Sequence, residues 1–311
     1  MSVNSRIIGE FETFGRCLVL GNGQLEAYVT IDAGPRVIRL ARPGGANLFF
    51  ADTEGLLTES GPKLKAAYGD DAVYRFYGGH RLWMSPEYIE STYAPDNDPV
   101  SVTTSPDGAL FMPPPQERNG LQFSLRLSLA EGASELAVEH VIENIGQAPI
   151  TLAPWAITQL APGGVEILPQ SKRDTGLLPD RLMALWPYTD MGDTRVTWGD
   201  DALLLRQDET IERAFKIALY NRAGWGAYVN GGTAFIKLFE TSGGEEYPDG
   251  GMNFESYTNN LFIEMETLGP LRALRKGERT VHTERWRIAD APAGLDRNNL
   301  AACLAFAKSI V

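Results

Sequence analysis

The chain has 311 residues, of which 40 are acidic and 28 basic, and its formal net charge is −12. Such a surface repels phosphate backbones, which argues against nucleic acid as a partner. No apolar run approaches the roughly 18 residues of a membrane span, and no leader pattern is present, so we expect a cytoplasmic protein with no membrane partner. A chain of this length buries about three quarters of its surface and needs no disulfide, so Cys17 and Cys303 are expected to be buried free thiols.

Short strands and tight turns dominate the sequence from the N-terminus onward. Residues 17–20 and 24–31 flank Gly21-Asn22-Gly23, which suits a tight turn. Strict alternation predicts a strand over 121–129 with five apolar side chains on one face: Leu121, Phe123, Leu125, Leu127 and Leu129. Similar β-rich runs cover 136–157 and 214–240. This density of turn signals predicts antiparallel sheets.

The C-terminus carries the best helical pattern. Leu300, Cys303, Leu304 and Ala307 follow helical spacing, and Asp296 is a candidate N-cap. The loop-rich stretches 52–71, 93–99 and 168–201 are too apolar for interdomain linkers. We therefore expect a single domain over residues 1–311, with function carried by these long loops.

Three segments, in order, resemble the galactose mutarotase-like superfamily, which includes the aldose 1-epimerases. Residues 20–50, with Gly34-Pro35-Arg36-Val37-Ile38 and Asn47-Leu48-Phe49, are similar to its opening hairpins. VEHVIENIGQAPITLAPWAITQL (138–160) is similar to the stretch that carries the catalytic histidine. LFIEMETLGPLRALRKGERTVHTERW (261–286) is similar to the strand that carries the catalytic glutamate. The block GGHRLWMSPE (78–87) resembles bacterial branches of the superfamily other than the true mutarotases.

The resemblance implies an all-β supersandwich of two large antiparallel sheets, with a sugar site on a concave face and no cofactor. The sequence differs from the mutarotases at one catalytic position. The histidine of the second segment is the general acid of mutarotases, and the matching position here is Trp155. An indole N–H donates a hydrogen bond but does not shuttle protons near neutral pH. Trp155 is therefore a candidate for substrate binding and not for catalysis.

Two glutamates in the third segment are the leading catalytic candidates. On a strand, Ile263 and Met265 face one way, while Glu264 and Glu266 face the other. Like charges so close together raise the pKa of one carboxyl group, which suits an acid–base pair. The resemblance makes one of the two the base; the alternative is an exposed polar face.

The block 78–87 offers the remaining candidates. His80 is the proposed acid, because the ordinary pKa of imidazole suits proton transfer near neutral pH. Arg81, Trp83 and Glu87 are candidates for substrate binding, since sugars pair their hydroxyls with charged groups and stack their C–H faces on aromatic rings. The alternative for His80 is a hydrogen-bonded core residue.

The other titratable groups suggest structural roles. His140 and His282 alternate onto apolar strand faces and are expected in the core. The three histidines are too dispersed to predict a zinc site, so we expect no metal. Asp190, Asp193, Asp200 and Asp201 form an acidic loop that we expect to be solvated, with calcium binding left open.

Two classes of function follow, and a third is related. The first is a carbohydrate-binding aldose epimerase that interconverts sugar anomers with His80 and the glutamates. The second is a non-catalytic sugar-binding or sensing domain, because Trp155 occupies the acid position. The third is a lyase or glycosidase on a similar sandwich. The expected partner is a small carbohydrate, and the sequence favours no particular sugar or oligomeric state.

Overall fold

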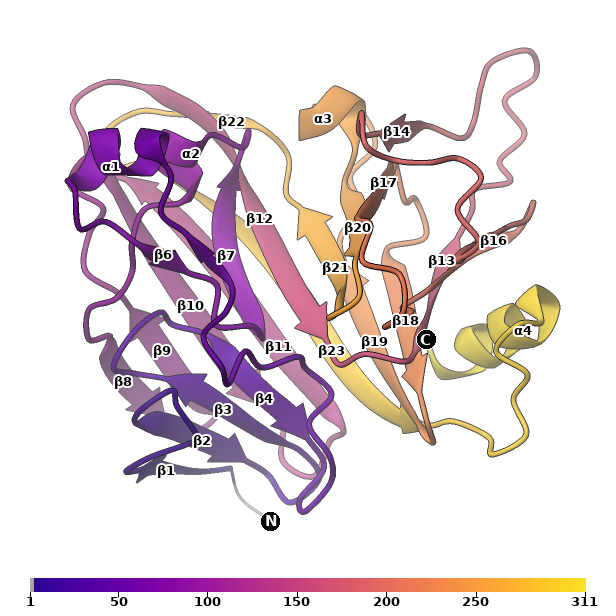
Figure 1. Cartoon of the computed structure of the whole chain (residues 1–311), viewed down its shortest axis with the longest axis horizontal. Helices are drawn as coiled ribbons and strands as arrows, with labels where there is room; N and C mark the ends of the chain where they lie inside the picture. Colours follow the sequence, from indigo (N-terminus) through magenta and orange to yellow (C-terminus); the bar gives the residue numbers. More distant parts are fainter. Residues whose placement is uncertain (1–2) are drawn as a thin grey trace.

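Two large antiparallel sheets pack face to face in the computed structural model, which describes residues 3–311 (Figure 1). The first sheet runs, in spatial order, through β1 (Asn4–Ile8), β2 (Cys17–Gly21), β3 (Glu26–Thr30), β4 (Val37–Ala41), β7 (His80–Ser85), β12 (Ile150–Leu160), β21 (Ile263–Leu268), β20 (Phe254–Thr258), β17 (Phe215–Leu219) and β14 (Met183–Leu185), with β22 (Arg272–Leu274) paired to β12. The second runs through β15 (Val196–Trp198), β16 (Ala202–Arg206), β13 (Val165–Pro169), β18 (Trp225–Asn230), β19 (Thr233–Phe239), β23 (Arg279–Asp290), β11 (Glu135–Asn144), β10 (Leu121–Leu129), β9 (Gly108–Met112) and β8 (Ser101–Ser105). The predicted all-β sandwich is confirmed.

The remaining elements are short and lie around this sandwich. They are the two-stranded sheet of β5 (Thr58–Glu59) and β6 (Tyr74–Arg75), and the helices α1 (Pro62–Tyr68), α2 (Ile89–Thr92), α3 (Pro248–Gly251) and α4 (Leu300–Ile310). Figure 1 shows α1 and α2 together at one end of the molecule and α4 at the other. None of the helices among residues 3–311 combines the length and the apolar character needed to cross a membrane.

The core lies between the two sheets and follows the period-2 pattern of the strands. On β10 all five alternating apolar residues are buried, while the polar residues between them are partly exposed, as predicted. Phe111 and Leu127 of the second sheet meet Leu20 and Met265 of the first in one apolar cluster. Burying each such side chain contributes roughly 1.5–3 kcal/mol, so this layer fixes which face of every central strand points inward.

The C-terminal helix covers the outer face of the second sheet. Cys303, Leu304 and Ala307 are buried there against the β13 and β16 side chains. Its N-cap is Asn299, whose side chain accepts a hydrogen bond from the Ala302 amide at 3.0 Å; the prediction of Asp296 as the cap is wrong. Both cysteines are free and buried, as expected.

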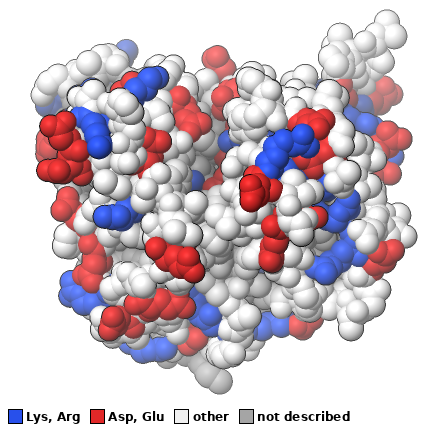
Figure 2. Space-filling model, viewed as in Figure 1, with Lys and Arg blue, Asp and Glu red and all other residues white. Residues whose placement is uncertain are grey.

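The outer face of the first sheet is covered by loops. A second hydrophobic cluster packs Trp83 and Trp155 of that face against Tyr74 of β6, which belongs to the covering segment that also carries α1. Acidic and basic side chains are interspersed over the molecular face shown in Figure 2, and no broad patch of one sign appears there. The long loops thus build a second, smaller packed layer where the site residues emerge.

Candidate functional site

A cavity of about 410 Å³ opens on the loop-covered face of the first sheet. Small-molecule sites are commonly about 300–1,000 Å³. The lining combines aromatic rings with a few charged and amide groups, contributed by Phe76, Arg81, Trp83, Glu87, Tyr93, Trp155, Gln159, Trp186, Tyr188, Lys216, Tyr257, Phe262, Glu264 and Glu266 among others. The structure therefore brings together six of the seven residues predicted for the site; the exception is His80.

Strand register explains how residues distant in the sequence converge. β21 pairs with β12 and β20, so that Glu264 lies opposite Gln159 on one side and Tyr257 on the other. One further pairing places Lys216 of β17 opposite Tyr257. Residues directly opposite in antiparallel strands project from the same face. This one cross-strand row carries an amide, a carboxyl, a phenol and an ammonium group into the cavity.

Glu266 lies deep in the cavity and is fully buried. Its Oε2 accepts hydrogen bonds from the Trp155 indole N–H at 2.8 Å and from Lys216 Nζ at 3.1 Å. Its Oε1 has no hydrogen-bond partner among the described residues. An ammonium and an N–H donor stabilise a carboxylate charge. Glu266 is thus paired with a buried cation and keeps one oxygen free for a ligand.

Glu264 lies two residues along the same strand, in a different environment. Its Oε1 accepts from Gln159 Nε2 at 2.9 Å and lies 3.3 Å from Arg81 Nη2. Burial and the neighbouring Glu266 raise the pKa of Glu264 to about 7, against the opposing effects of Arg81 and Lys216. Two carboxyl groups whose environments differ in this way can serve as proton donor and proton acceptor at neutral pH.

Lys216 is the buried cation that balances this acidic site. Its Nζ lies 2.7 Å from Glu255 and 3.1 Å from Glu266, over the rings of Trp155 and Trp186 at 4.8 and 4.6 Å. Burial alone would lower the pKa of Lys216, but the Glu266 and Glu255 carboxylates outweigh burial and raise it well above its ordinary value. The ammonium is therefore charged and already paired.

Aromatic rings form the walls of the cavity. Trp83 packs edge-on against Trp155, with ring centroids 5.4 Å apart, and its indole N–H donates to the Tyr74 hydroxyl at 2.7 Å. Glu87 lies exposed at the rim, where it accepts a hydrogen bond from Tyr93. Flat rings beside convergent polar groups suit a ligand with apolar C–H faces and hydroxyl edges.

We predict that Trp83→Ala lowers the free energy of unfolding by about 3–5 kcal/mol, because the Trp83 ring is only 5% exposed and packs against several other rings. Urea unfolding measures the change. Trp198→Ala is the control: Trp198 is 42% exposed, so its loss should change stability by no more than about 0.5 kcal/mol. Similar small changes for both variants would show that Trp83 does not hold the wall.

His80 does not reach the cavity, which corrects its predicted place beside the glutamates. Its side chain points between the sheets, where Nδ1 lies 2.8 Å from the Thr158 hydroxyl and Nε2 lies 2.7 Å from Nε2 of His140. Arg81 and Trp83, one and three residues further along β7, project from the opposite face into the cavity. Burial lowers the pKa of His80 well below its ordinary value, reinforced by His140. It is a neutral core histidine.

The same layer gathers His80, His140 and Glu284, whose ligand atoms lie within 4.8 Å of one another. Hydrogen bonds and an ion pair already use most of the atoms that could bind a metal. His140 Nδ1 must donate to the carbonyl of His282 at 2.9 Å, so its Nε2 lone pair accepts the His80 N–H. Glu284 accepts from Trp286 at 2.7 Å and pairs with Lys237 at 2.9 Å. This arrangement is a hydrogen-bonded core network and does not fit a cation site; His140 and His282 are core residues, as predicted.

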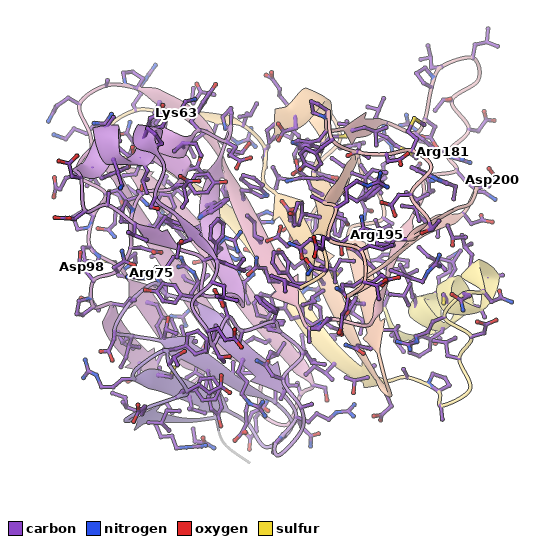
Figure 3. All side chains as sticks on the ribbon, in the orientation of Figure 1. Lys63, Arg75, Asp98, Arg181, Arg195 and Asp200 are labelled. Carbon is purple, nitrogen blue, oxygen red and sulfur yellow. The ribbon has the colours of Figure 1, made fainter. Side chains whose placement is uncertain are left out.

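Each acidic residue of the loop is paired with a basic side chain, and Arg213 contacts both Asp190 and Asp193. Asp190 pairs with Arg213, Asp193 with Arg195, Asp200 with Arg181, and Asp201 with Lys172. Figure 3 shows Arg181 and Asp200 near the periphery, while Arg195 lies further into the molecule. Asp193 and Arg195 are buried, so the predicted solvated loop is wrong at this point. The four carboxylates do not converge on one calcium position.

Several residues that line the cavity were not predicted from the sequence. Lys216 is the most informative, since a lone lysine within the apolar run FKIAL (215–219) is a signal for a buried, paired charge. Tyr188 and Tyr257 gave no comparable signal. Trp186 also lines the cavity.

No family model matches the chain, and no curated protein matches it. Solved structures with similar folds were found. A candidate aldose 1-epimerase from Klebsiella pneumoniae matches with a TM-score of 0.58 and 12% identity, over 99% of this chain and 86% of that one. A galactose mutarotase-like protein from Lactobacillus casei matches with a TM-score of 0.55 and 9% identity, over 88% and 100%.

A third match is a TPR-domain containing protein from Parabacteroides distasonis, with a TM-score of 0.56 and 17% identity. The match covers 92% of this chain but only 48% of that protein, so this chain corresponds to about half of that longer one. At these identities the likeness concerns the fold alone. Together with the two large antiparallel sheets, it shows that this chain has the galactose mutarotase-like fold.

Proposed function

We propose that the chain binds a carbohydrate of monosaccharide size in this cavity and interconverts its anomers, as an aldose epimerase does. The observation that carries the proposal is the pair Glu264 and Glu266, which share one face of β21 and line a single aromatic-walled cavity. Alternate residues on a strand are about 6.6 Å apart, close enough for both carboxyl groups to reach neighbouring atoms of one sugar ring.

The two glutamates have complementary roles in this proposal. Glu266, which is paired with Lys216, takes the proton of the anomeric hydroxyl, while protonated Glu264 gives its proton to the ring oxygen. The bond between C1 and the ring oxygen breaks, and the open-chain aldehyde rotates about its C1–C2 bond. The reverse transfers close the ring on the other face and return both protons. No cofactor takes part in this sequence.

The direct test measures anomer exchange by NMR or polarimetry across common hexoses, pentoses and their acids. The wild-type protein should accelerate exchange for at least one of these sugars, and Glu264→Gln should remove that acceleration. A rate equal to that of buffer for every sugar would refute the catalytic proposal.

We expect turnover to fall as pH rises through about 7. A carboxylic acid with a pKa near 7 is protonated below that pH and loses its proton above it, so the fraction of Glu264 able to donate drops about tenfold per pH unit in the alkaline range. The measurement is kcat/KM between pH 5 and 9, corrected for the buffer-catalysed rate. A profile that stays flat from pH 6 to 9 would exclude Glu264 as the acid.

One observation favours a second candidate, a non-catalytic sugar-binding or sensing domain. By the sequence resemblance, Trp155 matches the position of the superfamily's histidine acid, and its indole N–H donates to Glu266. No histidine lines the cavity among residues 3–311. Saturable sugar binding without anomer exchange would support this function over the enzyme.

A further inference from the structure

Arg81 is a buried cation whose hydrogen-bonding capacity is largely unused. Only 2% of its surface is exposed, and its guanidinium lies over the Trp83 and Phe76 rings at 4.4 and 5.4 Å. Nη2 contacts Glu264 at 3.3 Å, whereas Nε and Nη1 have no hydrogen-bond partner among the described residues. Buried donors are normally satisfied, so two free ones on a cavity wall indicate an acceptor that arrives with the ligand.

The other buried cations on this face of the first sheet are already satisfied. All three guanidinium nitrogens of Arg36 are engaged, with Asp96 as the ionic partner at 2.6 Å. Lys216 is paired with both Glu255 and Glu266. Arg81 has only the one long contact with Glu264, a group that burial and Glu266 already push toward its neutral form. Arg81 is therefore the cavity cation available to a ligand.

The surrounding acids limit which anion fits. Glu264 and Glu266 line the cavity beside Arg81, Glu87 lies at its rim, and Glu255 lies behind Lys216. A phosphate dianion would meet this acidic wall with a single arginine to balance it. A carboxylate carries one charge and matches the planar guanidinium. The free acceptors, Oε1 of Glu266 and Oε1 of Gln159, suit hydroxyl groups on the same molecule.

We propose that the ligand is a sugar acid, a uronate whose carboxylate binds Arg81 while its hydroxyls bind Glu266 and Gln159. This inference rests on the proposed carbohydrate function and specifies its substrate class. It also assigns Arg81 the role of distinguishing uronates from the corresponding neutral sugars.

Titration calorimetry at pH 6, supported by the fluorescence of the cavity tryptophans, tests the preference. The probes are galacturonate and glucuronate, each compared with galactose or glucose, and glucose 6-phosphate as the phosphate-bearing control. A uronate should bind about 10- to 100-fold more tightly than its parent hexose, the usual gain from a hydrogen-bonded charge pair. Equal affinity for hexose and uronate overturns the inference while leaving the carbohydrate function intact. Tighter binding of glucose 6-phosphate than of either uronate would show that the ligand's anionic group is not a carboxylate. If no sugar binds, both the uronate inference and the proposed carbohydrate function are overturned.

Three variants distinguish a role of Arg81 in ligand recognition from a purely structural role. Arg81→Met should reduce the uronate preference to within about twofold while hexose affinity changes little, and Arg81→Lys should retain part of the preference because it keeps the charge. Glu264 is ionised above about pH 7, so at pH 8 Glu264→Gln removes a carboxylate that competes for Arg81 while keeping the side-chain volume. Uronate affinity measured at pH 8 should therefore rise severalfold in this variant, and hexose affinity should not. If Arg81→Met does not fold, the Glu264→Gln comparison decides: unchanged or weaker uronate binding in that variant overturns the proposed role of Arg81.

Discussion

Glu266→Gln is expected to lower the turnover of any sugar interconverted in the cavity by roughly 10²–10⁴, the usual contribution of a positioned acid or base. The substitution preserves volume and can still contact the Trp155 indole and Lys216, which now hold Glu266 at 2.8 and 3.1 Å. What it removes is the lone pair that accepts the anomeric proton. KM should change less than kcat, because the free Oε1 position remains able to hydrogen-bond a hydroxyl.

The matched control for this substitution is Glu139→Gln, at an exposed position on a strand of the second sheet. It should leave turnover unchanged. Stability must be followed in both variants, since Glu266 is fully buried and its charge balances Lys216. A folded Glu266→Gln protein with turnover within a few-fold of wild type would remove Glu266 from the mechanism and leave Glu264 as the remaining member of the pair.

Local sequence pattern predicted the glutamate pair but misplaced His80, and one physical reason accounts for both results. On β21, Ile263 and Met265 are apolar and Glu264 and Glu266 are charged, so the alternation identifies the two faces. On β7 both faces are buried, and each carries a mixture of polar and apolar residues. The sequence pattern of β7 therefore does not show which of its faces points to the core and which to the cavity. Strict alternation nevertheless implies that His80 and Arg81 point in opposite directions, and this alone separates the imidazole from the cavity.

Long-range register explains what the sequence could not supply. Gln159, Glu264, Tyr257 and Lys216 belong to four strands, and they share a row only because of how β12, β21, β20 and β17 pair. The spatial order of these four strands differs from their order in the sequence. Each strand alone reads as an ordinary β-segment, and the choice of neighbour depends on the packing of the whole sheet. Lys216 was consequently missed, although it pairs with Glu266 in the cavity and with Glu255 behind it.

Lys216→Met is expected to lower the free energy of unfolding by about 3–5 kcal/mol, the usual effect of removing one partner from a buried ion pair. The ammonium lies between the carboxyl groups of Glu255 and Glu266, both about 1% exposed, and methionine fills a similar volume without the charge. The loss should be larger at pH 8 than at pH 5. Without the lysine, buried carboxyl groups have raised pKa values, so the folded state gains protons and recovers stability as pH falls.

Urea unfolding of three proteins at both pH values tests the role of Lys216. Lys63→Met, at an exposed position, should change stability by no more than about 0.5 kcal/mol. The double variant Lys216→Met/Glu255→Gln should be more stable than Lys216→Met, because one of the two unpaired carboxylates is gone, and the gain should be greatest at pH 8. If the single and double variants were equally stable at both pH values, the carboxylates would not depend on Lys216 for compensation. The electrostatic account of the cavity, including the pairing of Glu266 with Lys216, would then be wrong.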